Sequence, residues 1–172
     1  DSPLPQLRLP RRTVHVWYAS LQQSIDNVRR FAGYLSEAEQ ARVSRLHFER
    51  HRRRFTVARG LLRHLLGRYL DVAPDRVEFV YGTQGKPRLA GIHWNNDLHF
   101  NVSHAGERAL YAVALGAPIG IDLEYMRPLD DVERMARLVF SAREQAELLG
   151  LDPVARLAGF YNGWTRKEAY IK

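Results

Sequence analysis

Three carboxylates in the second half of the sequence have the types and spacing for metal-assisted phosphate chemistry. Asp122 and Glu124 lie two residues apart in the segment GIDLE, so on a strand both side chains point to the same face. Glu168 lies in the final segment WTRKEAYIK, in the middle of the apolar stripe that a helix would form there. A carboxylate on such a stripe is costly unless a cation compensates it. Because hard oxygen ligands without His or Cys suit Mg²⁺ better than Zn²⁺, we predict that these three residues bind magnesium.

Each of these carboxylates also has a simpler interpretation. Paired acids at the end of a strand are often only surface residues. Glu168 and Lys172 have the i, i+4 spacing of an ordinary helical ion pair, which contributes roughly a few tenths of a kcal/mol. We favour the metal site because the apolar stripe makes Glu168 a poor surface residue.

Lysine is rare in this chain, since only three of the 26 Lys and Arg residues are Lys. A lysine ammonium is a compact charge suited to phosphate, whereas an arginine guanidinium is a planar fork. Lys86 lies in the turn-like segment GKP and Lys172 ends the sequence, while Ser103 and His104 end the strand-like segment FNVSH. A lone His is more often structural than catalytic, but polar neighbours at alternate positions favour a ligand contact. Together with the three carboxylates, these residues are typical of a metal-assisted phosphoryl or phosphodiester site.

The net charge of +7 is concentrated in residues 42–68, which hold nine Arg and one acid, Glu49. This run is either a solvated helix face or a binding surface for phosphates or an acidic protein. The absence of cysteine excludes disulfides and thiolate metal sites and fits a reducing cytoplasm. No apolar run approaches the ~20 residues needed to span a bilayer.

Hydrophobic patterning predicts a mixture of helices and strands, and therefore an α+β fold. Capping boxes at Ser36 and Ser141 start two helices, and Asp152-Pro153 starts the last one. A longer amphipathic helix is expected over 52–70. Strands are expected at 13–19, 77–82, 98–104, 109–115 and 119–125. The order helix, strand, turn, strand occurs twice, loosely, on either side of LGAP, which weakly indicates a duplication.

GKP, FNVSH, GIDLE and WTRKEAYIK occur in an order and spacing that resemble the 4′-phosphopantetheinyl transferases. The resemblance is closer to the larger, monomeric, surfactin-synthetase-activating type, and it covers about residues 35–172. It implies a pseudo-dimer of two similar α+β halves, here 1–116 and 117–172, with the active site in the cleft between them. Family members usually continue past the KEAYIK-like segment, so the second half is expected to be truncated in this chain.

The resemblance also implies the reaction. A serine hydroxyl of an apo acyl or peptidyl carrier protein attacks the β-phosphate of coenzyme A, which is the co-substrate. Phosphopantetheine is transferred and 3′,5′-ADP leaves, with Mg²⁺ as the cofactor. The implied setting is the cytoplasm, in fatty acid, polyketide or nonribosomal peptide synthesis, for a monomer without a nucleic-acid or membrane partner.

Residue roles follow from the same motif matches. Asp122, Glu124 and Glu168 match the magnesium ligands, and Glu168 also matches the general base. Lys172 matches the lysine at the pyrophosphate. The remaining matches concern the phosphates of coenzyme A: Lys86, Ser103 and His104 near the phosphates, with Arg42 and Arg54 at the 3′-phosphate and adenosine end.

Two other functions remain compatible with these residues. A Mg²⁺-dependent nuclease also uses acids and a lysine, although its Glu and Lys usually lie two apart on a strand. A non-catalytic nucleic-acid-binding module would use the Arg-rich run and would bind DNA with a steep salt dependence. The second alternative leaves GIDLE and Glu168 unexplained.

Overall fold

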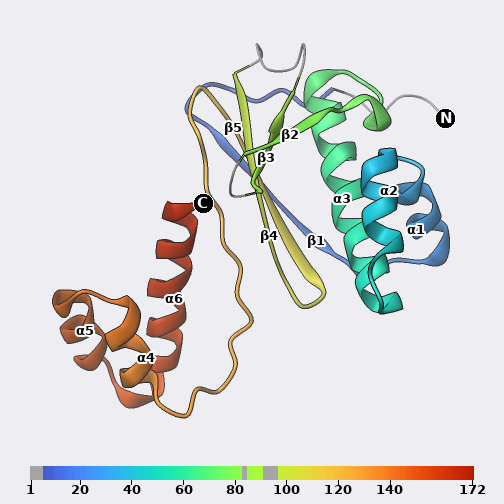
Figure 1. The fold of residues 1–172 in the computed structure, drawn as a ribbon. Helices are drawn as coiled ribbons and strands as arrows, with labels where there is room; N and C mark the ends of the chain where they lie inside the picture. The colour runs from blue at the N-terminus through green and yellow to red at the C-terminus, as the bar shows by residue number, and fades with distance from the viewer. Residues whose placement is uncertain (1–5, 83–84, 91–96) are drawn as a thin grey trace.

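The computed structural model describes residues 6–82, 85–90 and 97–172. Its helices and strands are shown in Figure 1. Their order is β1 (Val14–Ser20), α1 (Ile25–Ala32), α2 (Glu37–Ser44), α3 (Glu49–Leu70), a 3₁₀ turn (Pro74–Arg76), β2 (Phe79–Tyr81), β3 (Pro87–Leu89), β4 (Leu98–Ala105), β5 (Arg108–Leu115), α4 (Val132–Val139), α5 (Ala142–Leu149) and α6 (Pro153–Ile171). None of these described helices is both long and apolar enough to cross a membrane.

The main sheet has three antiparallel strands in the order β1-β5-β4, and β2 pairs separately with β3. Side chains alternate between its two faces. On β4, Phe100 and Val102 point to the core, so Asn101 and Ser103 point to the opposite face. This alternation separates the residues that stabilise the sheet from those that build the site.

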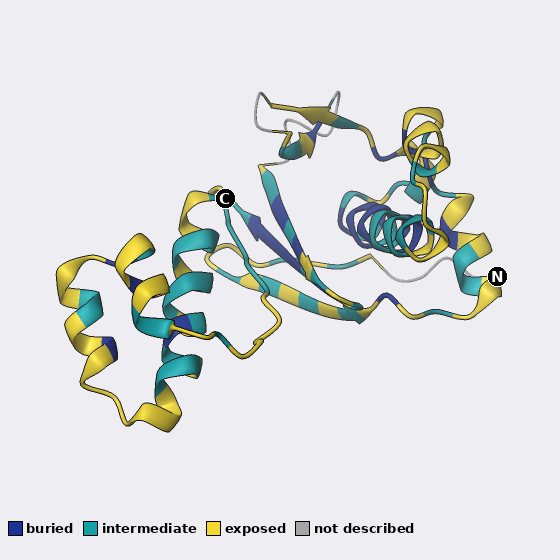
Figure 2. Ribbon diagram, turned by 60° about the horizontal axis from the view of Figure 1, so that its bottom comes forward, coloured by how far each residue is buried: buried dark blue, intermediate teal, exposed yellow. Residues whose placement is uncertain are grey.

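One face of the sheet packs on α3, and this contact forms the larger hydrophobic core. Val57 and Leu66 of α3 and Tyr111 and Val113 of β5 are almost completely buried in it. Gly60 permits α3 to approach α1, since a Cβ at this position would lie 2.5 Å from the Cβ of Phe31. Figure 2 shows that buried residues concentrate on α3 and the strands.

The opposite side of the sheet carries the second group of helices, α4 to α6 (Figure 1). Residues 116–131 connect β5 to this group without forming a helix or strand. The group has a smaller core, in which Ala136, Phe140, Leu148 and Phe160 are buried. The sheet therefore lies between a large helical layer and a small one.

Most expected elements are confirmed. Strands form within 13–19, 77–82, 98–104 and 109–115 or one residue beyond them. Both capping boxes are present, at Ser36 and Ser141, and Asp152 caps α6. The long helix α3 begins three residues before the predicted start at 52. The predicted turn TQGKP includes residues 83 and 84, which lie outside the described residues.

The predicted strand at 119–125 is wrong, because no neighbouring backbone pairs with it in the described structure. Its amides bond instead to side chains of β4. Residues 118–172 therefore contain helices and no strand, whereas the first part contains a sheet. The α+β mixture is confirmed, but the similarity of two halves is not.

Candidate active site

Two buried polar side chains of β4 hold the segment 118–123 against the sheet. The amide of Ile121 donates to Asn101 Oδ1 across 3.0 Å, and the amide of Leu123 donates to Ser103 Oγ across 3.2 Å. Both β4 residues are only 5% exposed. Because Asn101 and Ser103 lie two residues apart on one strand, they share a face and fix this segment at two points. Asp122, between the two anchored amides, is thereby set against Ser103.

Gly120 brings the C-terminal end of α6 onto this segment. A Cβ on Gly120 would lie 1.8 Å from the carbonyl oxygen of Ala169, which is closer than any real contact. Only glycine therefore permits the helix end to pass at this distance. The close approach places Lys172, three residues later, within reach of Asp122.

Lys172, Asp122 and Ser103 form one polar cluster. The Lys172 ammonium donates to Asp122 Oδ1 in a short ion pair and to Ser103 Oγ across 3.2 Å. Ser103 in turn donates to Asp122 Oδ1 across 3.0 Å. The Asp122 side chain is 3% exposed, and its second oxygen, Oδ2, is buried without a hydrogen-bond partner. Such an oxygen bears a desolvation cost, which a cation or a further donor would remove.

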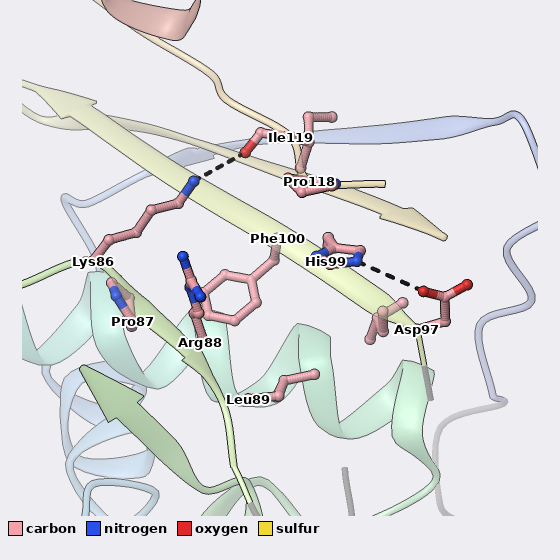
Figure 3. A pocket seen from close by; sticks show the side chains of 10 residues that line it. Lys86, Pro87, Arg88, Leu89, Asp97, His99, Phe100, Pro118 and Ile119 are labelled. Atoms are coloured by element: carbon pink, nitrogen blue, oxygen red, sulfur yellow. Dashed lines mark hydrogen bonds and ion pairs between the residues drawn. The ribbon is translucent and has the colours of Figure 1, made fainter. Parts of the chain in front are cut away.

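Lys86, which directly precedes β3, also contacts this cluster. Its ammonium donates to the carbonyl oxygens of Ile119, across 3.4 Å, and of Lys172. Burial and the neighbouring charge of Arg88 lower the pKa of Lys86. Figure 3 shows this side chain reaching from the start of β3 over a pocket of about 280 Å³ towards Ile119. Lys86 therefore binds both the 118–123 segment and the end of α6.

A second pocket, of about 560 Å³, lies between α3 and the ends of β3 and β4. We call it the basic pocket. Its cationic and titratable lining consists of Arg42, Arg54, Arg59, His51 and His104. The Arg42 guanidinium lies over the Phe55 ring at 5.0 Å. Several positive charges around one pocket favour an anionic ligand.

His104 is the residue that links the basic pocket with the lysine cluster. It lies near the end of β4, next to Ser103, and is an exposed residue. Its pKa is lowered because protein atoms surround part of the ring and because Lys172 and Arg54 are nearby cations. The ring is therefore neutral near pH 7 unless an anion binds beside it.

The three predicted magnesium ligands are not gathered in one place. No group of three or more His, Asp or Glu in the described residues could hold a metal ion. Glu124 is exposed and lines one hollow together with Tyr161 and His104, whereas Glu168 lines another, of about 840 Å³, on the α4–α6 layer. The residues thus fit a metal only in part, through the partnerless oxygen of Asp122.

The structure brings other predicted residues together. Lys86, Ser103, Asp122 and Lys172 meet at the end of α6, while Arg42, Arg54 and His104 line the basic pocket. Sequence reasoning missed Glu107, which forms an ion pair with Arg54. Nothing in the local sequence identifies this partner, because the two residues are 53 positions apart.

Comparison with known proteins identifies the class. Residues 17–116 match the family model described as 4′-phosphopantetheinyl transferase, N-terminal, and residues 118–172 match that of the 4′-phosphopantetheinyl transferase superfamily. The chain therefore belongs to the 4′-phosphopantetheinyl transferases, which are enzymes. Family membership favours the transferase interpretation over the nuclease and nucleic-acid-binding alternatives.

Several curated relatives carry the same name. The chain is 44% identical to the 4′-phosphopantetheinyl transferase HetI of Nostoc sp. over 168 residues, which are 98% of this chain and 71% of HetI. It is 36% identical to AcpT of Escherichia coli over 70% of this chain and 57% of AcpT. It is 28% identical to Sfp of Bacillus subtilis over 90% of this chain and 66% of Sfp. The chain thus spans part of the length of each relative.

Proposed function

We propose that the protein transfers the 4′-phosphopantetheine group of coenzyme A to a serine of an apo carrier protein and releases 3′,5′-ADP. The observation that carries the proposal is the meeting of Lys86, Ser103, Asp122 and Lys172 beside the basic pocket. A coenzyme with a pyrophosphate and a 3′-phosphate is an anion of matching chemistry. The proposed carriers serve fatty acid, polyketide or nonribosomal peptide synthesis in the cytoplasm, and the proposed enzyme is a monomer.

In this proposal, different residues bind different phosphates of coenzyme A. Arg42 and Arg54 bind the 3′-phosphate, while Lys86, His104 and Lys172 bind the pyrophosphate. Ammonium and guanidinium groups held in place before the reaction stabilise the charge that develops on the leaving phosphate. Since a phosphate competes with Asp122 for the Lys172 ammonium, binding of the coenzyme loosens that ion pair.

Glu168 is the proposed general base for the carrier serine. In the described structure no ion pair engages its carboxylate, so it is available to accept a proton. The Asp122 carboxylate is less accessible for this role, because Lys172 and Ser103 both donate to its Oδ1.

Magnesium belongs to the proposal through Asp122, whose partnerless oxygen would accept a cation. Glu124 and Glu168 are the proposed further ligands. They must approach Asp122 to complete such a site, since the described residues form no such group. A bound Mg²⁺ would neutralise charge on the pyrophosphate.

The test combines the protein with coenzyme A, Mg²⁺ and an apo acyl carrier protein or an apo peptidyl carrier domain. Mass spectrometry should detect a phosphopantetheine adduct on the carrier and 3′,5′-ADP in solution. Asp122→Ala should abolish the adduct, whereas Glu147→Gln, in an exposed ion pair on α5, should not. No adduct with either carrier would contradict the proposed function. Wild-type transfer by Asp122→Ala would contradict only the role of Asp122.

A further inference from the structure

Glu107 lies in the tight β4–β5 turn and pairs with Arg54, which lines the basic pocket. The turn consists of Gly106, which has a φ of 57°, and Glu107. The Glu107 carboxylate pairs with Arg54. Nε and Nη2 of the Arg54 guanidinium both donate to Glu107 Oε1, and the bond from Nε is 2.6 Å long. The hydrogen bond from Arg54 lowers the pKa of Glu107, so this carboxylate is ionised at neutral pH. The arginine therefore carries an intramolecular anion in the ligand-free structure.

The other arginines of the basic pocket are engaged differently. Arg59 pairs with Glu39 across 3.5 Å, and both side chains are largely buried, so this pair belongs to the interior. Arg42 lies over Phe55, and no carboxylate of the described residues pairs with it. The Arg54–Glu107 pair is different, since its side chains are 31% and 33% exposed and can separate at modest cost.

We propose that Glu107 is a specificity-determining residue that competes with the 3′-phosphate of coenzyme A for Arg54. This inference rests on the proposed function, in which Arg54 binds that phosphate. A phosphate can bind the Nε and Nη2 edge of the Arg54 guanidinium only after Glu107 releases it, and the carboxylate that remains nearby repels the phosphate. Glu107 therefore weakens the binding of ligands with a 3′-phosphate and leaves other ligands unaffected.

The competition has a use in the reaction. The 3′-phosphate does not take part in the chemistry, so it is present on coenzyme A and on the product 3′,5′-ADP alike. A contact made equally to substrate and product retains the product as strongly as it binds the substrate. By weakening this contact, Glu107 speeds release of 3′,5′-ADP.

The opposite role is that Glu107 holds Arg54 in the orientation that binds phosphate. The two roles predict changes of opposite sign when the carboxylate is removed. Glu107→Gln is the suitable variant, because it removes the charge and keeps the side-chain size. It also leaves the hydrogen bond from the Leu21 amide to the Glu107 carbonyl, which is a backbone contact. Glu107→Ser is a second neutral variant for use if the first is poorly folded.

The experiment measures the dissociation constants of coenzyme A, 3′,5′-ADP and dephospho-coenzyme A by calorimetry. Glu107→Gln should bind the first two about fivefold more tightly, the size expected for a partly exposed ion pair. Dephospho-coenzyme A, which lacks the 3′-phosphate, should bind unchanged. The control Glu147→Gln makes the same charge change in the exposed Arg143–Glu147 pair and should change none of the three constants.

A double-mutant cycle then assigns the effect to Arg54. In an Arg54→Ala background, Glu107→Gln should no longer improve binding of coenzyme A. Weaker binding by Glu107→Gln, or an equal change for coenzyme A and its dephospho form, would overturn the inference and leave the transferase proposal intact. If the wild-type protein binds none of the three ligands, the proposed function fails, and the role of Glu107 fails with it.

Discussion

The two oxygens of Asp122 have unequal surroundings. Oδ1 accepts from Ser103 and Lys172, while Oδ2 is buried without a partner. A carboxylate intended only to neutralise Lys172 would not need burial, because exposed ion pairs form readily at the surface. The asymmetry supports the proposal that Asp122 is held for a ligand.

His104 gives a prediction about protons. Its pKa is lowered in the ligand-free protein, and a bound phosphate would raise it. Binding of coenzyme A should therefore be accompanied by uptake of a proton by His104. The affinity for coenzyme A should rise as the pH falls towards 6.5, which is about the ordinary pKa of histidine. Calorimetry at pH 7 in two buffers with different ionisation enthalpies measures this uptake.

The matching control is His104→Asn, which retains a polar side chain but cannot titrate. Any proton exchange that remains in this variant belongs to other groups, such as the coenzyme's own phosphate or His51 of the basic pocket. Equal proton uptake by the wild-type protein and the variant would show that His104 does not contact an anion.

Elements differ in how far their own residues determine them. Ser36 and Ser141 could be recognised as caps because a capping box needs only four consecutive residues. The strand prediction for 119–125 was wrong because a strand depends on a distant part of the chain. The alternation of this segment fits a strand, but a strand needs a partner backbone, and here Asn101 and Ser103 provide side-chain acceptors instead. The pair of Arg54 with Glu107 escaped prediction for the same reason, since it depends on the tertiary fold.

The contact between α5 and α6 gives a prediction about acid stability. Glu144 accepts hydrogen bonds from Lys167 and from Ser141, and these lower its pKa from 4.5 to about 2. A depressed pKa means that the contribution is complete above about pH 4.5 and is lost as the pH falls towards 2. The melting temperature should therefore drop through this window.

Glu144→Gln tests this assignment, because glutamine can still complete a capping box but carries no charge. The variant should melt at a lower temperature than the wild-type protein at pH 7, and this difference should shrink as the pH falls from 4.5 to 2.5. Glu147→Gln removes another carboxylate of the same helix and should show no such convergence. Parallel pH profiles for the wild-type protein and Glu144→Gln would contradict the role of Glu144.

At the scale of the whole molecule, the two helical layers meet the sheet through very different contacts. The α1–α3 layer is joined to the sheet by one hydrophobic core, and the buried residues of both are dark blue in Figure 2. The small core of the α4–α6 layer includes no described residue of the sheet. This layer contacts the sheet side through polar contacts such as that of Lys172 with Asp122, and through the close approach of α6 to Gly120. The site therefore depends on the less extensively packed of the two connections.

Gly120→Ala tests how much depends on this close approach. The added methyl group would collide with the Ala169 carbonyl, which is backbone and cannot rotate away. We expect the free energy of unfolding to fall by about 3 kcal/mol, at the upper end of typical overpacking costs, and transfer to be lost. Urea denaturation and the carrier-protein assay measure the two effects.

Gly82→Ala is the matched control. A Cβ at Gly82 meets nothing within 4 Å, so this variant should retain wild-type stability and transfer. If Gly120→Ala behaved like the control, α6 could shift without consequence, and the contact between Lys172 and Asp122 would not depend on Gly120.

The hydroxyl of Ser103 has a single hydrogen, and in this structure Asp122 receives it. The hydroxyl oxygen meanwhile accepts from the Leu123 amide and from Lys172. A phosphate can receive a hydrogen bond from Ser103 only if the hydroxyl rotates away from Asp122. Rotation would leave the buried Asp122 carboxylate with one hydrogen-bond donor fewer, so a cation bound there would stabilise it more. We therefore expect that binding of an anion at Ser103 and binding of a cation at Asp122 are coupled positively, so that each ligand increases the affinity for the other.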